Sequence, residues 1–173
     1  MNDVKADRKR WGSRPVCGVP QYTVVKWKRI CERWREVKPL YLAARMIYRH
    51  VQIKYGVNIP AQTKIGQGFQ IEHTGGIVIN PEVQIGENCN LCNGVTIGRE
   101  KRGKRIGVPV IGDRVWIGAN AVIVGNIRIG SDVLIAPGSF VNFDVPDHSI
   151  VLGNPAKVIP RENATETYIT NTV

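Results

Sequence analysis

The sequence IGDRVWIGANAVIVGNIRIGSDVLIAPGSFV, residues 111–141, places an aliphatic residue at every sixth position. That series is Ile111, Ile117, Ile123, Ile129, Ile135 and Val141. A companion series runs two residues out of step with it: Val115, Ala121, Ile127, Val133, Ser139 and Val145. An α-helix repeats every 3.6 residues and a lone strand every 2, so neither explains a period of six.

The same rhythm extends toward the N-terminus. It includes Ile59, Ile65, Ile71 and Ile77, and then, two positions later, Ile79, Ile85, Leu91 and Ile97. A short strand followed by a bend, repeated many times, gives this period. Three of these strand-and-bend units form the three sides of one coil of roughly 18 residues. Because each coil stacks its aliphatic residues on its neighbours, the sequence predicts a mainly β protein, a parallel β-helix of about five coils over residues 56–150.

Two breaks interrupt the period. The first, between Ile71 and Ile79, contains His73, Thr74, Gly75 and Gly76. The second, residues 99–109, does not fit a hexad, so we expect it to leave the coil as an extruded loop. Loops that leave a rigid scaffold often carry function.

The remainder of the chain divides by composition. Residues 1–20 are polar and basic, with scattered glycine and proline, and predict a basic mobile arm. Residues 22–37 and 40–54 have helical spacing, which defines a helical appendage over 21–55. In the second helix one apolar stripe is expected, formed by Leu40, Ala43, Ala44, Ile47 and Val51. Residues 151–173 form a C-terminal segment and tail.

The net charge of +10 comes entirely from residues 1–54, which hold 14 Lys and Arg against four acidic residues. Such a patch attracts polyanions, among them an anionic membrane surface; nucleic acid is not expected as a partner. Trp27, Trp34 and Tyr48 could face either the rest of the protein or a membrane surface, and packing against the protein is the favoured interpretation. The N-terminal charges precede no apolar segment of a signal peptide. The expected location is the cytoplasm, with the basic segment able to contact the inner membrane surface.

The cysteines and histidines limit the chemistry. Cys89 and Cys92 have C-x-x-C spacing, but no second Cys or His pair completes a zinc site, so ordinary thiols and no metal are expected. The three histidines are His50, His73 and His148. Only His73 lies at a break in the period, where an irregular corner can present a side chain.

Several motifs together resemble those of the hexapeptide-repeat acyltransferases. They are the hexads, VWIG at 115–118, and the ending from Asp144-Val145-Pro146 to Gly153-Asn154-Pro155-Ala156-Lys157. Residues 57–79 are similar to the serine acetyltransferase branch, and the end of the repeats to its relatives in surface-polysaccharide biosynthesis. The resemblance implies a left-handed β-helix, a homotrimer and acetyl-CoA as co-substrate in a groove between subunits.

The resemblance also implies roles in the reaction. His73 matches the histidine that acts as general base, and Asn58 stands where serine acetyltransferases have an aspartate that orients it. Glu72 replaces a second aspartate, and Gly107 and Val108 replace an arginine and a histidine of the serine site. A sugar hydroxyl is therefore favoured as acceptor over serine, and Glu72 is a candidate to hold it; Gly75 and Gly76 are candidate oxyanion donors.

For the cofactor, the resemblance places Gly118, Ala119, Ala136 and Gly138 along the pantetheine arm, and Lys157 and Arg161 at the phosphates. Gly118 and Gly138 are equally explained as turn glycines. The alternatives are a serine O-acetyltransferase of cysteine biosynthesis and a non-catalytic β-helix that binds acyl-CoA or a partner. A carbonic anhydrase on this scaffold would need three zinc-binding histidines within the repeats, which the sequence lacks.

Overall fold

A computed structural model describes residues 3–173. Three helices come first: α1 (Asp3–Lys9), α2 (Pro20–Arg33) and α3 (Lys38–Tyr55). Short strands follow: β1 (Val57–Asn58), β2 (Lys64–Ile65), β3 (Gln70–Ile71), β4 (Ile77–Ile79), β5 (Gln84–Ile85), β6 (Asn90–Leu91), β7 (Thr96–Gly98), β8 (Val110–Ile111), β9 (Val115–Ile117), β10 (Val122–Val124), β11 (Arg128–Ile129), β12 (Val133–Ile135), β13 (Phe140–Val141), β14 (Ser149–Gly153) and β15 (Ala156–Pro160).

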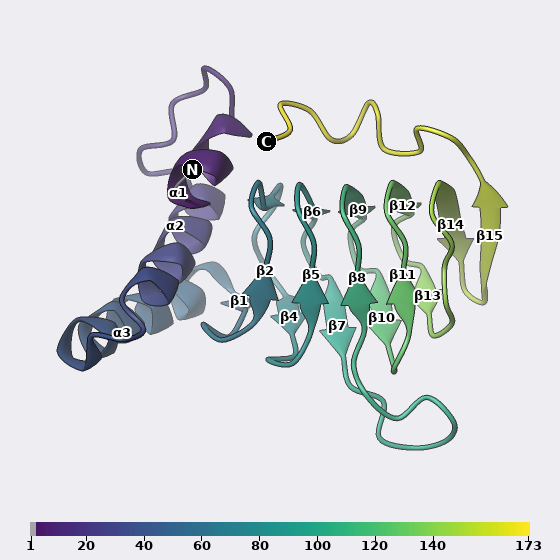
Figure 1. The fold of residues 1–173 in the computed structure, drawn as a ribbon, viewed down its shortest axis with the longest axis horizontal. Coiled ribbons are helices and arrows are strands. Elements are labelled where there is room, and N and C mark those ends of the chain that lie inside the picture. Colours follow the sequence, from purple (N-terminus) through teal and green to yellow (C-terminus); the bar gives the residue numbers. More distant parts are fainter. Residues whose placement is uncertain (1–2) are drawn as a thin grey trace.

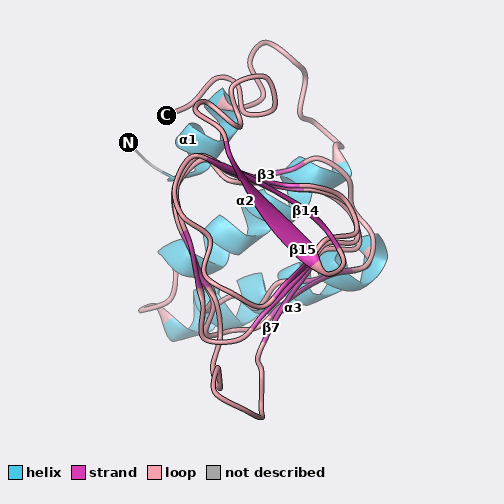
Figure 2. Ribbon diagram, turned by 90° about the vertical axis from the view of Figure 1, so that its right-hand side faces the viewer, coloured by secondary structure: helices cyan, strands magenta, loops and turns pink. Residues whose placement is uncertain are grey.

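The strands form three sheets, one for each side of a solenoid (Figure 1). Their orders are β1-β4-β7-β10-β13, β11-β8-β5-β2 and β15-β14-β12-β9-β6-β3. Every ladder is parallel except β14 with β15, which closes the last coil as a hairpin. Figure 2, which looks along the coils, shows their rounded triangular outline. The predicted mainly β, parallel β-helix is confirmed.

The strand registers locate both breaks in the period. Val122 pairs with Phe140, which is the regular spacing of 18 residues. Val57 pairs with Ile77, a spacing of 20, because the corner containing His73 is two residues longer. Thr96 pairs with Val122, a spacing of 26, because residues 99–109 leave the coil as the loop that projects from it in Figure 1.

The aliphatic residues at every sixth position fill the inside of the triangle. Ile71, Ile97, Ile117, Ile123 and Ile129 are fully buried. Tight contact between coils also explains some glycines: a Cβ on Gly66 would lie 2.6 Å from the backbone carbon of Gly86. Each coil thus buries its apolar side only by stacking on the next.

The N-terminal segment differs from the expected mobile arm. Residues 3–9 form α1, and Asp7 and Arg10 are buried. The polar sequence does not indicate this because the partners are distant: Asp7 accepts a hydrogen bond from the Phe69 backbone N–H (3.0 Å), and Arg10 donates one to the carbonyl of Gly68 (3.2 Å). Charged residues here attach the segment to the first coil.

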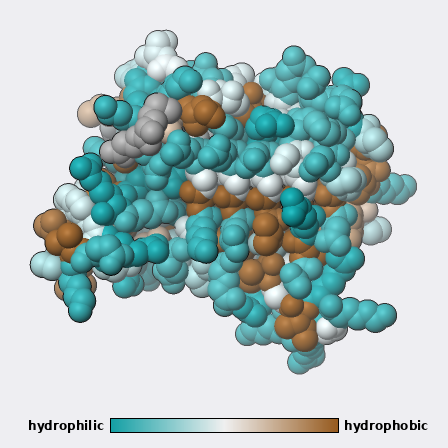
Figure 3. All heavy atoms as spheres, viewed as in Figure 1, coloured by the Kyte–Doolittle hydropathy of each residue, from teal (hydrophilic) through white to brown (hydrophobic). Residues whose placement is uncertain are grey.

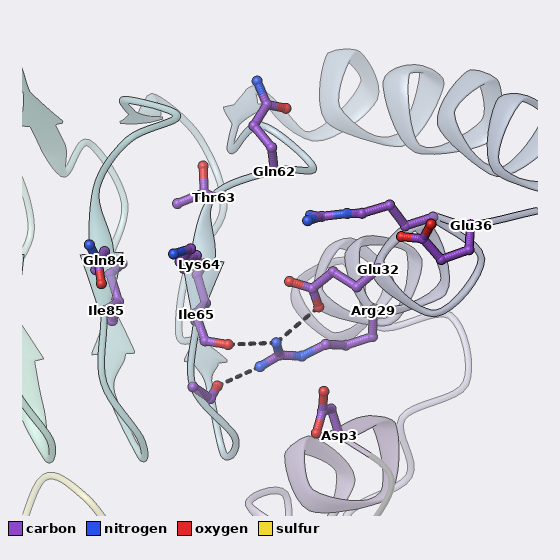
Figure 4. Close-up of a pocket in the computed structure, with 12 residues that line it drawn as sticks. Asp3, Arg29, Glu32, Glu36, Gln62, Thr63, Lys64, Ile65, Gln84 and Ile85 are labelled. Carbon is purple, nitrogen blue, oxygen red and sulfur yellow. Dashed lines mark hydrogen bonds and ion pairs between the residues drawn. The ribbon is translucent and has the colours of Figure 1, made fainter. Parts of the chain in front are cut away.

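Arg29 of α2 is the centre of this attachment. Its guanidinium lies 2.8 Å from Asp7 and 3.0 Å from Glu32, and donates to the carbonyl of Ile65 (2.7 Å). Figure 4 shows Arg29 reaching from the helix to β2, beside a cavity of about 490 Å³. Lys28 similarly donates to the carbonyl of Thr63 (2.9 Å). Part of the N-terminal positive charge is therefore internal and paired.

The helices α2 and α3 lie close to the predicted ranges, but the buried face of α3 differs from the predicted apolar stripe. Ala44 and Val51 are buried as expected, whereas Leu40, Ala43 and Ile47 are exposed. Tyr48 is buried instead and donates a hydrogen bond to the carbonyl of Ile59 (2.8 Å). The helix has two apolar faces, and the spacing of its apolar residues alone did not show which of them is buried.

The chain beyond β15, residues 161–173, is called the tail below. It returns along the outside of the six-stranded sheet toward α1, so the two ends of the described chain lie near each other (Figure 1). Val173 exchanges hydrogen bonds with Asn88, and Lys9 donates to the carbonyl of Thr172 (3.2 Å). The tail thereby connects the last coil with the early coils and with α1.

Candidate active site

One edge of the triangular solenoid gathers most of the predicted site residues. It consists of the corners between the six-stranded and five-stranded sheets, residues 72–76, 92–95, 118–121 and 136–139, and is called the His73 edge. Backbone hydrogen bonds stack these corners: Gly94 N–H to Gly75 O (2.8 Å), Asn120 N–H to Asn93 O (3.0 Å) and Gly138 N–H to Ala119 O (2.8 Å). His73, Gly118, Ala119, Ala136 and Gly138, distant in sequence, therefore share one edge.

The two candidate glycines differ in what they allow. A Cβ on Gly118 would lie 2.6 Å from the backbone nitrogen of Pro137, so coil packing already requires glycine there. A Cβ on Gly138 would meet nothing within 4 Å, and its φ of +69° is one that glycine adopts readily. Gly138, with the small side chains of Ala119 and Ala136, leaves the edge open to a thin ligand such as a pantetheine arm.

The two candidate phosphate-binding cations are separated. Lys157 pairs with Leu152 near the tip of the β14–β15 hairpin, beside the end of the His73 edge, where the Gly153 N–H reaches Ser139 Oγ (3.2 Å). Arg161 follows β15, and its N–H donates to the His148 carbonyl at the other end of the hairpin. Four residues of extended chain, roughly 13 Å, separate them.

His73 is exposed, and its imidazole has no hydrogen-bond partner among residues 3–173. The backbone N–H groups of Gly75 and Gly76 likewise find no acceptor within the described chain. A free imidazole and free N–H groups at one corner are what a general base and oxyanion donors need.

A cavity of about 740 Å³ opens beside His73. Three parts of the chain enclose it: residues 10–14, 19 and 21 before and within α2, residues 167–171 of the tail, and the β3 and β6 region. Its aromatic walls are Trp11 and Tyr168, and its uncharged polar side chains are Ser13, Gln21, Gln70, Asn90, Thr167, Thr170 and Asn171. The charged residues are Arg10, Arg14 and Glu72.

The carboxylate of Glu72 is already engaged. It accepts hydrogen bonds from Asn90 Nδ2 (2.8 Å) and Trp116 Nε1 (2.8 Å), and Cys92 Sγ lies 3.5 Å away. Asn90 in turn accepts from Arg10 (2.6 Å). Glu72 therefore organises the floor of the cavity, and its side chain is less available to an acceptor than the sequence suggested.

Asn58 lies elsewhere in this chain. It is an exposed residue of β1 and lines a different cavity, together with Arg45, Tyr48, Arg49 and others. No hydrogen bond joins Asn58 to His73 within the described residues. The structure thus brings Glu72 and His73 to one cavity and leaves Asn58 outside it.

The tail is held at its start by Asp132, a residue that the sequence did not single out. Its buried carboxylate accepts hydrogen bonds from the backbone N–H groups of Ala164 and Thr165 (both 3.1 Å), the Thr165 hydroxyl (2.8 Å) and His148 Nδ1 (2.9 Å). Further on, Tyr168 contacts Trp116, with ring centroids 4.7 Å apart. These contacts fix the tail that walls the cavity. Asp132 was missed because its partners lie 16 to 33 residues further along the chain and only the fold brings them together.

These hydrogen bonds shift the pKa values of Asp132 and His148 in opposite directions. Burial acts to raise the pKa of Asp132, but the hydrogen bonds from Thr165, His148 and Ala164 outweigh it and hold that pKa below its usual range. The hydrogen bond to Asp132 raises the pKa of His148, with further support from the Glu162 charge. The charged pair therefore persists between the lowered pKa of Asp132 and the raised pKa of His148.

We expect the start of the tail to loosen in alkali. Because the folded-state pKa of His148 is raised, its contribution is fully present below about pH 6.5 and is lost as the pH rises through the folded value. Hydrogen-exchange protection factors for Ala164 and Thr165 should be constant below about pH 6.5 and should fall as the pH rises above it, through the raised pKa of His148. The Gly118 amide, bonded within the coils, is the internal reference. If the His148→Gln variant kept the same pH dependence, His148 would not be the group whose charge holds the start of the tail.

Among residues 3–173, no group of three His, Cys, Asp or Glu side chains could hold a metal ion. Cys89 and Cys92 are buried free thiols, and burial raises the pKa of each to about 12. Cys92 instead packs with Trp116 and Ile169 under the tail.

Comparisons with known proteins agree with this geometry. A family model described as bacterial transferase hexapeptide (six repeats) matches residues 109–142, and one described as hexapeptide repeat of succinyl-transferase matches residues 82–99. Serine acetyltransferase 4 of Arabidopsis thaliana is 37% identical over 85% of the chain, which spans 41% of that relative. The putative colanic acid biosynthesis acetyltransferase WcaB of Escherichia coli K12 is 34% identical over 91% of the chain and 97% of the relative.

Solved structures are similar as well. Serine acetyltransferase from Neisseria gonorrhoeae matches with a TM-score of 0.76 and 33% identity, over 92% of this chain and 66% of that one. Serine acetyltransferase from Brucella abortus in complex with coenzyme A matches with a TM-score of 0.76 and 27% identity, over 92% and 66%.

A three-sided solenoid with a histidine-bearing corner edge defines a hexapeptide-repeat protein. The chain belongs to the hexapeptide-repeat acyltransferase family, and its fold is the left-handed parallel β-helix of that family. The two serine acetyltransferases of Arabidopsis thaliana that the chain matches are much longer than it, and the chain spans about two fifths of each.

Proposed function

We propose that the protein is an acetyl-CoA-dependent O-acetyltransferase that acetylates a sugar hydroxyl, with His73 as general base. His73 would take the hydroxyl proton as the oxygen attacks the thioester carbonyl, and coenzyme A would leave as its thiol. The acetyl-CoA would lie along the His73 edge, past Ala119, Ala136 and Gly138. The Brucella relative, whose structure contains coenzyme A, supports the donor.

The cavity beside His73 carries the proposal of a sugar acceptor. Amide and hydroxyl side chains can both donate to and accept from hydroxyl groups, and Trp11 and Tyr168 offer apolar faces to a pyranose ring. Serine instead needs a carboxylate partner and an ammonium partner. Glu72 is bound within the protein, Gly107 has no side chain, and Val108 packs against the core.

The relatives support two acceptors. Serine acetyltransferases are prominent among them, so serine O-acetylation remains the second candidate. The relative named for colanic acid biosynthesis, however, matches over 97% of its own length, and its name points to a polysaccharide pathway. A non-catalytic acyl-CoA or partner-binding β-helix is the third candidate.

The proposed assembly is a homotrimer with the active site between subunits. Within residues 3–173 of one chain the His73 imidazole has no partner and Asn58 lines another cavity, so a neighbouring subunit would complete the base and its surroundings. The proposed location is the cytoplasm, since all four cysteines are free thiols, as is typical of reducing compartments.

The acceptor is tested by coenzyme A release with serine, nucleotide-sugars and defined oligosaccharides. Gln70 begins β3 and lines the cavity, and its matched control Gln84 begins β5 on another face. If Gln70 hydrogen-bonds the acceptor, Gln70→Ala should raise KM for the sugar by up to about tenfold, the value of one hydrogen bond. Gln84→Ala should leave KM unchanged. Turnover of serine alone would overturn the sugar proposal and leave acetyl transfer standing.

A further inference from the structure

Helix α3 has one face that packs on α2 and the first coil, and a second face that no element of residues 3–173 covers. Ala44, Tyr48, Val51 and Gln52 are its buried residues. On the opposite side, Leu42, Met46 and Ile53 are 62%, 69% and 65% exposed. At about 100° per residue these three fall within an arc of roughly 40°, so they form one line along the helix.

Basic residues border this apolar line on both sides. At the same 100° spacing, Lys38, Arg45 and Arg49 fall on one side of it, and His50 and Lys54 on the other. All five side chains are exposed. The sequence contains no Asp or Glu between Glu36 and Glu72, so no acidic residue of α3 offsets them.

The position of α3 makes this face accessible. The helix lies at the N-terminal end of the solenoid and extends away from the coils (Figure 1). In Figure 3 that end shows a brown apolar patch bordered by teal polar atoms. No helix of the described chain is long and apolar enough to cross a membrane.

We propose that the outward face of α3 binds an anionic phospholipid surface. An apolar line flanked by Lys and Arg, three on one side and Lys54 on the other, is the arrangement of a helix that lies in the membrane interface, with its aliphatic side chains among the acyl chains and its cations at the headgroups. A second copy of the same face is disfavoured as occupant, because like cations would meet. The sequence assigned membrane contact to the whole basic segment; the structure restricts it to one face of one helix.

The docked face would hold the reaction close to a membrane and is independent of which hydroxyl is acetylated. Arg29, Lys28 and Arg10 do not take part, since they are buried and bonded internally. The proposal therefore predicts that membrane binding depends on the cations of α3 and not on most of the helical appendage.

Co-sedimentation of the full chain with vesicles tests it. The chain should bind phosphatidylcholine vesicles containing about one third phosphatidylglycerol and should not bind pure phosphatidylcholine. Met46→Gln/Ile53→Gln should lower that binding at least about tenfold, and Arg45→Gln/Arg49→Gln should lower both the binding and its salt dependence. The matched control is Val78→Gln/Val110→Gln, which changes two exposed aliphatic residues on the solenoid. It should bind as the wild type does.

Two results would overturn the proposal. One is equal vesicle binding by the wild type and Met46→Gln/Ile53→Gln. The other is loss of the oligomer in that variant, measured by light scattering, with vesicle binding unchanged, which would show that the face contacts another copy. Circular dichroism of each variant confirms that these exposed substitutions leave the fold intact.

Discussion

Replacing His73 with alanine should lower kcat for acceptor-dependent acetyl transfer by roughly 10²–10⁴-fold, the usual contribution of a general base. His73 is exposed at the corner of the first coil, beside the cavity and on the same edge as Ala119, Ala136 and Gly138. Its imidazole is bonded to nothing within the described chain, so its removal should leave the fold unchanged. The loss should therefore appear in kcat, with thermal stability retained.

The other two histidines are controls for this result. His50 is exposed on α3, and His148 contacts Asp132 and Glu162 on the far side of the hairpin from the edge. His50→Ala should keep the wild-type turnover, and His148→Ala should keep most of kcat even where a loosened tail raises KM. Steady-state coenzyme A release makes the comparison, and wild-type turnover by His73→Ala would eliminate this mechanism and favour the non-catalytic candidate.

Replacing Arg29 with alanine should destabilise the protein by about 3–5 kcal/mol, because it leaves the Asp7 carboxylate buried without its partner. The side chains of Arg29 and Asp7 are 3% and 1% exposed. The guanidinium also donates to the carbonyls of Ile65 and Gly66, which would lose these donors. For a chain of this size, the melting temperature should fall by roughly 10 °C.

Arg33→Ala is the matched control, since Arg33 ends the same helix, carries the same charge and is exposed. It should change the free energy of unfolding by no more than about 0.5 kcal/mol. In Arg29→Ala/Asp7→Ala the loss should be smaller than the sum of the single losses, since the uncompensated charge is gone. Additive losses, measured by thermal unfolding, would argue against a coupled pair.

The β-helix could be predicted from the sequence because its period is local and repeats many times. Ile117, Ile123 and Ile129 each indicate the same inward direction, and each is fully buried. The two register shifts were also visible, at His73 and at residues 99–109, because an interruption is obvious within a strict period.

The residues that only the fold brings together could not be predicted in this way. Asp7 finds its partners 22 and 62 residues away, and Glu72 finds Trp116 44 residues away. Such contacts depend on one pair of side chains, without a repeated pattern. The same limit applies to the cavity, whose walls come from both ends of the chain, whereas His73 itself was recognisable from its place in the period.

The return of the tail also bears on how the protein unfolds. A solenoid in which each coil contacts only its neighbours can fray from either end, one coil after another. Here the tail is bonded to Asp132 near the last coil and to Asn88, Lys9 and Arg10 at the other end. Neither end can open without breaking contacts that belong to the other, so a chain built of repeats should lose its structure as one cooperative unit.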